Sequence, residues 1–559
     1  MFIPITKNEL NQLGWKKLDI ILVSGDAYID SPNIGVALLG KHLIKHGYKV
    51  GIISQPDIFN ANDISVFGEP ELFWGVTGGS VDSMVANYTA QKKFRKQDDF
   101  TPGAINNKRP DRAVIKYTNL IRQYYKNTKP IVLGGIEASL RRITHYDFWT
   151  NKLRKPILFN AKADFLLYGM AEKSILTLAE NLKNKENPKN INGLCYISKN
   201  KVDGFISLPS FEQVNNEKTK FLDMFKTFSE NCDPINCKGL QQKIDSSRYL
   251  IHNPSAHYLN EKELSEIYNL KFTREAHPLY RENVRALETI RFTVPTHRGC
   301  YGECNFCAIA IHEGARVRWR SATSIINEVQ QMTKHKKWRG NVADLSGPTA
   351  NMYGYECDIK IQKGKCKHKR CLFPEPCKKL KPNHIHQIKL LESINNIQGV
   401  KKVFVASGIR PELVRYDTKH GEKYVEIISK EHVSGQLKLA PESSSEKVLA
   451  YMGKHGFRNY LWFKKLYEKF NRKYKKNQFL TYYFIAAHPG CNDTDMKNIS
   501  HKVFKELKIK PEQVQLFTPT PSTWSTAMYY TETDPFKKKK LFVEKNMKAR
   551  EKQKKYLQK

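Results

Sequence analysis

The chain has 559 residues, of which 40% are hydrophobic, and carries a formal net charge of +38. Its length predicts two to four domains with ordinary globular cores. No apolar run approaches the roughly 20 residues that span a bilayer, and eleven cysteines are too few for a disulfide scaffold, which argues against membrane and disulfide-rich secreted classes. Residues 1–9 lack the pattern of a secretory signal, so a cytoplasmic location is expected.

The first third of the chain predicts an α/β domain. A buried strand at 19–24, a helix at 36–46 and a strand at 49–53 form a βαβ start. Three further strands are expected at 72–76, 130–133 and 164–168. Together they predict an open, doubly wound α/β domain over residues 1–185, followed by a connecting region over 186–285.

Glycines follow several of these strands, as in Thr77-Gly78-Gly79-Ser80 and Gly134-Gly135. Glycines at strand ends let a ligand approach the backbone at the switch point of an open sheet. No G-x-G-x-x-G run follows the first strand, so a dinucleotide site is not expected.

Three cysteines form a C-x3-C-x2-C loop at Cys300, Cys304 and Cys307. This spacing fits neither a zinc ribbon nor the C-x2-C-x2-C ferredoxin run. Three thiolates can hold three irons of a [4Fe–4S] cluster and leave the fourth iron open. A zinc site and buried free thiols are the alternatives.

Six apolar runs alternate with helical stretches between residues 286 and 530, and this order predicts a partial (β/α)6 TIM-like barrel. In such folds the chemistry collects at the C-terminal ends of the strands. The first strand, expected at 290–294, leads into the cysteine loop. Small or polar residues end the later strands, and those considered for ligand binding are Asp344, Ser346, Gly347, Ser407, Arg410, Glu442 and His488. Each could equally be a structural hydrogen-bonding partner.

A second cysteine group lies in a Lys- and Pro-rich insertion at 355–382 and consists of Cys357, Cys366, Cys371 and Cys377. Four thiolates can close an auxiliary iron–sulfur cluster or a structural zinc site. The alternative is a loop with surplus thiols.

Basic residues dominate the C-terminal tail, 531–559. Lys537 to Lys559 contains eleven Lys or Arg against Glu544 and Glu551, a net +9, which predicts a solvated helix or a disordered end. The basic stretch at 92–112 and the insertion add local charge. A basic surface can attract RNA through its phosphates; the alternative is a lysine-rich composition without a nucleic-acid partner.

The cysteine spacing, with Phe306 just before the last cysteine, resembles the radical S-adenosylmethionine (SAM) superfamily, which implies that the strand-end residues named above bind SAM. That resemblance implies that the open iron chelates SAM and that one-electron reduction cleaves SAM to a 5′-deoxyadenosyl radical. Several longer runs are similar to the YgiQ family, among them 24–28, 133–142, 347–354 and 487–490. The resemblance implies a cobalamin-binding-like domain before a radical SAM barrel, an unknown substrate, and a reductant such as flavodoxin or ferredoxin.

Cobalamin itself is expected to be absent, although it is not excluded. Asp30 and Gly35 hold the spacing of an Asp-x-His-x-x-Gly loop, but Pro32 stands where the cobalt-ligating His would be. A different class of hypothesis is a nucleic-acid-binding protein with a structural metal and no SAM chemistry.

Overall fold

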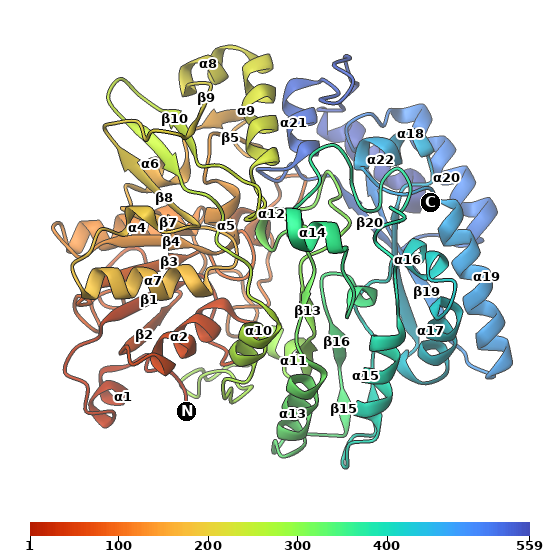
Figure 1. Cartoon of the computed structure of the whole chain (residues 1–559), viewed down its shortest axis with the longest axis horizontal. Coiled ribbons are helices and arrows are strands. Elements are labelled where there is room, and N and C mark those ends of the chain that lie inside the picture. Colours follow the sequence, from red (N-terminus) through yellow and green to blue (C-terminus); the bar gives the residue numbers. More distant parts are fainter. Residues whose placement is uncertain (559) are drawn as a thin grey trace. The chain divides into compact units, whose positions relative to one another are not determined.

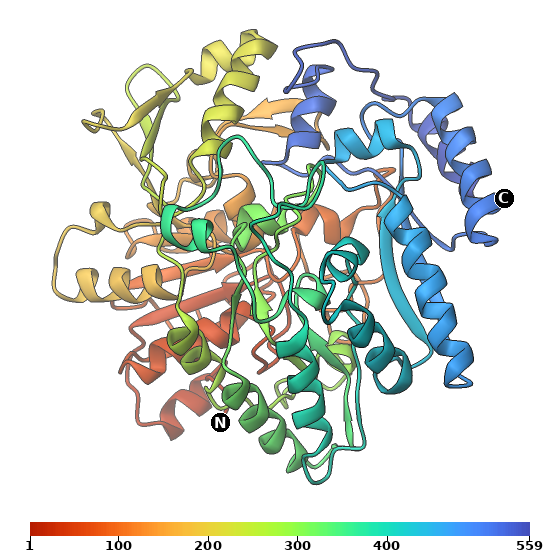
Figure 2. The same ribbon diagram turned by 45° about the vertical axis from the view of Figure 1, so that its right-hand side comes forward.

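The computed structural model describes residues 1–558, which divide into two compact units. The first contains Met1–Leu259 and Glu266–Arg291, and the second contains Asn260–Ser265 and Phe292–Lys559. Figures 1 and 2 show both units as layers of helices and strands.

The first unit is built on a nine-stranded sheet with the order β2-β1-β3-β4-β7-β8-β11-β10-β9. Five strands are parallel, in the order of doubly wound folds: β2 (Val50–Ser54), β1 (Ile20–Ser24), β3 (Phe73–Thr77), β4 (Ile131–Gly134) and β7 (Phe165–Leu167). All five residues of β1 are buried, because helices cover both faces of the sheet. The predicted open, doubly wound fold is confirmed.

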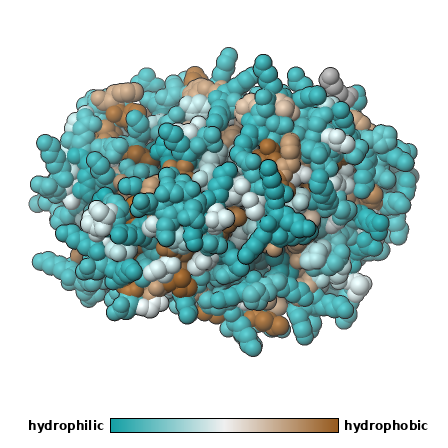
Figure 3. Space-filling view, turned by 90° about the horizontal axis from the view of Figure 1, so that it is seen from above, coloured by the Kyte–Doolittle hydropathy of each residue, from teal (hydrophilic) through white to brown (hydrophobic). Residues whose placement is uncertain are grey.

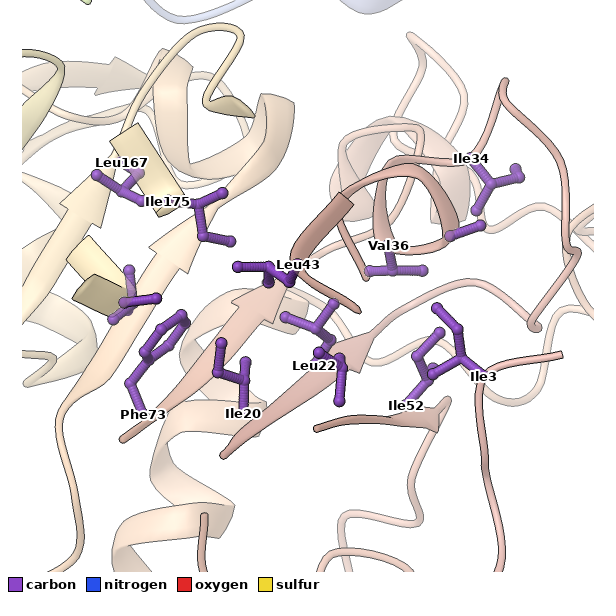
Figure 4. Close-up of a cluster of buried hydrophobic side chains, with 14 of the residues drawn as sticks. Ile3, Ile20, Leu22, Ile34, Val36, Leu43, Ile52, Phe73, Leu167 and Ile175 are labelled. Atoms are coloured by element: carbon purple, nitrogen blue, oxygen red, sulfur yellow. The ribbon is translucent and has the colours of Figure 1, made fainter. Parts of the chain in front are cut away.

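One face of this sheet carries a core cluster with α2 (Gly35–Lys45) and α7 (Glu172–Lys183). Leu43 of α2 and Ile175 of α7 lie over Ile20, Leu22 and Phe73 of the strands, as Figure 4 shows. These strand residues alternate along the chain because successive side chains of a strand point to opposite faces.

The region 186–285 contributes strands to the same sheet. These are β8 (Leu194–Ser198), β9 (Ile206–Leu208), β10 (Leu240–Lys243) and β11 (Tyr249–His252). The strands β8 and β11 pair antiparallel, and β8 pairs antiparallel with β7. This stretch, which the sequence presents as a connector, is therefore part of the first compact unit, apart from Asn260–Ser265.

The second unit contains the predicted six strands in chain order. They are β12 (Thr293–Pro295), β15 with β16 (Asn341–Val342, Asp344–Ser346), β17 (Lys402–Val403), β18 (Gln436–Glu442), β19 (Phe479–Ala486) and β20 (Gln513–Leu516). Parallel ladders join β12 to β16, β15 to β17, and β18 to β19 to β20. A parallel bridge between Ile409 and Leu439 links the chain after β17 to β18. The partial barrel is confirmed.

The first barrel strand begins three residues later than predicted. Ala286–Ile290 forms the helix α11, and Ile290 packs against the core of the first unit. Burial of Ala286 and Leu287 favours the helix, so the apolar run 290–294 is shared between two elements rather than forming one strand.

Of the two expectations for the tail, a solvated helix or a disordered end, the helix is confirmed for residues 547–558, but its full solvation is wrong. This segment forms α22 (Met547–Gln558), which packs on α20 (Asp493–Leu507) and β20. Arg550, Gln553 and Leu557 recur at helical spacing and are buried, because this face of the helix covers the barrel.

Across the described part of the chain, no helix has the length and apolar character needed to cross a membrane. The face of the molecule in Figure 3 is mainly hydrophilic, with scattered hydrophobic spots.

Candidate metal and SAM site

The cysteine loop is formed between β13 (His297–Arg298) and α12 (Ile309–His312). Gly299 opens it with a φ of +84°, and a Cβ there would lie 2.2 Å from the Arg316 carbonyl oxygen, so only glycine fits. The amide of Cys307 donates to the Cys304 oxygen at 3.0 Å and closes the turn. These contacts fold the C-x3-C-x2-C run back on itself.

The three thiols of this loop act on one another electrostatically. Burial raises the pKa of the Cys300 thiol, Arg410 opposes the rise, and the nearby Cys304 adds to it. Burial also raises the pKa of Cys307 to about 12, with contributions from Cys304 and Cys300. Bare thiols so placed resist ionisation, whereas metal coordination deprotonates a thiol outright. The donor set, three soft sulfurs on one loop, fits three irons of a cluster.

Arg410 is the cation beside these sulfurs. It follows β17, and its Nη1 donates to the Cys304 Sγ at 3.5 Å. Its Nε donates to the Glu412 Oε1 at 2.6 Å, and both residues are buried. A Cβ at Gly302 would lie 2.2 Å from the Arg410 Nη1, so the loop needs glycine there to admit the guanidinium.

The ion pair of Arg410 and Glu412 leaves one donor and one acceptor atom unused. Within residues 1–558, the Arg410 Nη2 and the Glu412 Oε2 are buried without a hydrogen-bond partner. Buried polar atoms normally have partners, and unpaired ones call for an explanation such as an absent ligand. A donor and an acceptor are thus available close to the thiols.

A second ion pair, between Lys454 and Glu442, borders the same thiols. The Lys454 Nζ lies 3.6 Å from the Glu442 Oε1 and donates to the Ala440 carbonyl. Burial raises the pKa of Glu442, and Lys454 and Arg410 oppose the rise. Lys454 acts electrostatically on Cys304, and Glu442 acts on Cys307. Glu442 has a φ of +66°, a strained conformation that is common at functional sites.

The structure thus brings Arg410 and Glu442 to the thiols, and it adds Glu412 and Lys454, which the sequence reasoning missed. Glu412 stands two residues after Arg410, a signal that was available in the sequence. Lys454 follows α18 (Glu446–Met452) in a short loop, where nothing in the sequence distinguishes it from other lysines.

The other strand-end candidates are bonded within the barrel. The hydroxyl of Ser407 donates to Asp344, whose other carboxylate oxygen accepts from the Ser407 amide at 3.2 Å. The carbonyl of Ser346 accepts from the Thr296 amide at 2.9 Å. Gly347 makes room for the His297 ring, since a Cβ there would lie 2.1 Å from it.

His488 is buried with both ring nitrogens satisfied. Its Nδ1 donates to the Pro489 carbonyl at 2.8 Å, and its Nε2 accepts from the Ser525 hydroxyl at 2.7 Å. Its ring meets Phe306 edge-on, with centroids 6.4 Å apart. His488 therefore supports the aromatic residue that precedes Cys307.

The four thiols of the second cysteine group lie in different environments. Cys366 is exposed, whereas Cys357 is buried in a hydrophobic cluster with Leu372 and Tyr355. Burial raises the pKa of Cys371 to about 11, and Lys360 opposes the rise. The amide of Cys377 donates to the Cys371 oxygen at 2.8 Å. A metal shared by all four cysteines stays a prediction.

The insertion also contacts the first cysteine loop. Lys365 pairs with Glu303, and the Arg370 Nη1 donates to the Glu303 carbonyl at 3.1 Å. Between Met1 and Gln558, no three His, Cys, Asp or Glu side chains are arranged around a single metal ion. The site described above is defined by three thiols in one loop, a donor set for a cluster.

Comparison with known proteins identifies the family. The Radical SAM N-terminal family matches residues 2–293, and a domain of unknown function, DUF3362, matches residues 512–559. A UPF0313 protein of Fusobacterium nucleatum is 54% identical over 556 residues, which cover 99% of this chain and 98% of the relative. The chain belongs to the UPF0313 family of radical SAM proteins. A UPF0313 protein of Thermotoga maritima is 46% identical over 559 residues, covering 99% of this chain and 98% of its own.

The UPF0313 protein also resembles solved structures in fold. One is the radical SAM methyltransferase TsrM of Kitasatospora setae with tryptophan and a SAM analog, at a TM-score of 0.52 and 13% identity, covering 90% of this chain and 74% of that one. Another is the cobalamin-dependent enzyme OxsB, at a TM-score of 0.50 and 12% identity, covering 92% and 55%. The OxsB structure and a second TsrM structure contain cobalamin. The expectation that cobalamin is absent therefore gains no support from the fold.

Proposed function

We propose that this UPF0313 protein is a radical SAM enzyme, of the group that the sequence resemblance places with YgiQ. Cys300, Cys304 and Cys307 would hold a [4Fe–4S] cluster with one open iron. When bound and reduced, this cluster supplies the electron that cleaves SAM and generates a 5′-deoxyadenosyl radical. The observation that carries the proposal is a single loop with three electrostatically coupled thiols, one of which accepts a hydrogen bond from the buried Arg410.

The surrounding side chains have roles of their own in this proposal. Arg410 and Lys454 place two cations beside the sulfurs and offset the negative charge of a thiolate-ligated cluster. The unpaired Arg410 Nη2 can donate to the carboxylate of SAM, and Glu442 can accept from its amino group. Ser407, which is held by Asp344, remains a candidate to bind the ribose of SAM. Ser346 and Gly347 remain candidates to contact SAM elsewhere.

The proposal includes partners. A one-electron donor such as flavodoxin or ferredoxin is required, because SAM cleavage consumes an electron. The substrate is undefined. RNA is one candidate because of the basic surface, and the cytoplasm is the proposed compartment. The second cysteine group would hold an auxiliary iron–sulfur cluster or zinc.

Anaerobic reconstitution with iron and sulfide tests this function. The full-length protein should take up iron and sulfide in equal amounts and show the absorption of a [4Fe–4S] cluster. After reduction, its electron paramagnetic resonance spectrum should change when SAM is added, because an open iron gains a ligand. A matched sample of Cys304→Ala should lose one cluster, and Cys232→Ala, in the first unit, should lose none.

The competing hypothesis predicts a different result. A nucleic-acid-binding protein with a structural metal should retain zinc, bind RNA with a strong salt dependence, and show no spectral response to SAM. A reconstituted protein that holds zinc but no iron would contradict the proposed function.

A further inference from the structure

The ligand site of a doubly wound sheet lies at the carboxyl ends of its strands, where the strand order reverses. In the first unit the strand order reverses between the neighbouring strands β1 and β3, and both strands are followed by glycines. The gap considered below is the crevice beyond the carboxyl ends of these two strands. A corrinoid bound by this fold would need that gap. The residues that line it show whether there is room.

The gap is closed by direct bonds between its two sides. The amide of Gly25, after β1, donates to the Thr77 carbonyl at 3.2 Å. The amide of Ser80, after β3, donates to the Asp26 Oδ2 at 2.6 Å. The two strand ends thus bind each other, and their polar groups are not directed to a ligand.

One side chain of the same unit fills what remains. Arg109 is fully buried, and its Nη1 donates to the Gly78 carbonyl at 2.6 Å. Its Nη2 lies 2.8 Å from the Asp26 Oδ1 and 3.1 Å from the Asp98 Oδ2. The guanidinium therefore joins the β1 loop to the β3 loop and brings its own carboxylate partners.

The glycines serve this internal occupant. A Cβ at Gly79 would lie 2.2 Å from the Asp26 Oδ1 and 2.5 Å from the Arg109 Nη1. A Cβ at Gly25 would lie 2.2 Å from the Gly78 carbonyl oxygen. The space that these glycines leave free is therefore occupied by the protein's own backbone, by Asp26 and by Arg109.

Two chain segments then cover the edge from outside. The Ala27 amide donates to the Phe100 carbonyl at 2.9 Å, and the His277 amide donates to the Tyr28 carbonyl at 3.0 Å. The two segments also bind each other, since the Gly103 amide donates to the Asn283 carbonyl at 3.0 Å. The loop after β1, which holds Pro32 in the position of a cobalt-ligating His, is buried beneath them.

We infer that Arg109 is the built-in occupant of this ligand site, and that the first unit binds no corrinoid at its switch point. The residues present do not fit the cofactor: the gap is bonded shut, filled by a guanidinium and covered by two segments. The inference is independent of the proposed SAM chemistry, and it narrows the reaction to a class that needs no corrinoid.

Cobalamin binding tests the inference directly. Full-length, reconstituted protein is incubated with excess hydroxocobalamin, desalted, and examined by visible absorption. Wild type should retain no corrinoid and cause no shift in its spectrum. Retention of one equivalent would overturn the inference, whatever the outcome of the SAM assays.

Variants of Arg109 test its part in the closure. Removing the guanidinium leaves two buried carboxylates without a cation, so Arg109→Ala should lower the melting temperature by roughly 5 to 15 °C. Arg95→Ala, at an exposed arginine of the same segment, should leave it unchanged. If Arg109→Ala does not fold, Arg109→Lys should melt below wild type. A folded Arg109→Ala with the wild-type melting temperature would overturn the role of Arg109.

Discussion

Arg410 reaches the sulfur of Cys304 from 106 residues away, with 3.5 Å between its Nη1 and the Sγ. The barrel makes this contact, because the cysteine loop follows the first strand and Arg410 follows the third. The same guanidinium also pairs with the buried Glu412. Arg410 therefore contributes both to the stability of the barrel and to the charge around the thiols.

Replacing Arg410 should therefore have two effects. Arg410→Gln leaves Glu412 buried without a cation and should lower the free energy of unfolding by about 3 to 5 kcal/mol in urea. In the reconstituted protein it also removes a cation and a donor from the sulfurs, which should shift the cluster potential to a more negative value. Arg415→Gln, at an exposed neighbour, should do neither. Adding Glu412→Gln should restore part of the stability; a double variant as unstable as Arg410→Gln would contradict the pairing.

Acidification should destabilise the first unit through His252. Burial, then the charge of Arg142, lowers the pKa of His252 to about 3, and its Nε2 accepts from the Arg142 Nε at 3.0 Å. The unfolded chain binds a proton near pH 6.5, while the folded protein stays neutral down to about pH 3. The contribution of His252 to the free energy of unfolding is thus fully present above pH 6.5. It falls as the pH is lowered toward 3, by up to about 1.4 kcal/mol per pH unit.

The matched comparison uses two histidines of the same unit. His252→Gln should flatten the dependence of the unfolding free energy on pH between about 6 and 4. His257→Gln, at an exposed position, should leave the slope as in wild type. Equal slopes for His252→Gln and wild type would show that His252 is not held neutral.

The C-terminal helix should be part of the folded barrel. Leu557→Ala removes a fully buried side chain, and the free energy of unfolding should fall by about 2 to 5 kcal/mol. Lys555→Ala, on the exposed face of the same helix, should change it by less than about 0.5 kcal/mol. Urea unfolding of the two variants checks this, and equal stabilities would mean that α22 is not docked in solution.

The second cysteine group makes a prediction about metal content. If Cys357, Cys366, Cys371 and Cys377 share one site, each single Cys→Ser variant should lose the same metal equivalent by elemental analysis. The SAM-responsive signal should persist, because its thiols are separate. Identical iron and zinc in wild type and all four variants would leave these residues as ordinary thiols, in keeping with the exposure of Cys366.

The sequence predicts the strands well where buried parallel strands are continuous apolar runs, as at β1 and β4. Prediction from sequence fails where one apolar run is divided between two elements, and where the buried face of a helix is polar. Ile290 belongs to a helix of the first unit, and Arg550 and Gln553 bury a polar helix face that hydrophobicity does not reveal. The cysteine loop is visible as local spacing. Arg410 is visible as a strand-end candidate, but its contact with Cys304 and the electrostatic action of Lys454 on Cys304 arise through closure of the barrel, which no local pattern encodes.

Formation of 5′-deoxyadenosine tests the central claim most directly. Reconstituted protein is incubated anaerobically with SAM and dithionite, and the product is quantified by liquid chromatography and mass spectrometry. Wild type and Cys232→Ala should form 5′-deoxyadenosine, and Cys304→Ala should form none above background. Absence of the product from wild type with an intact cluster, or equal formation by Cys304→Ala, would contradict the account.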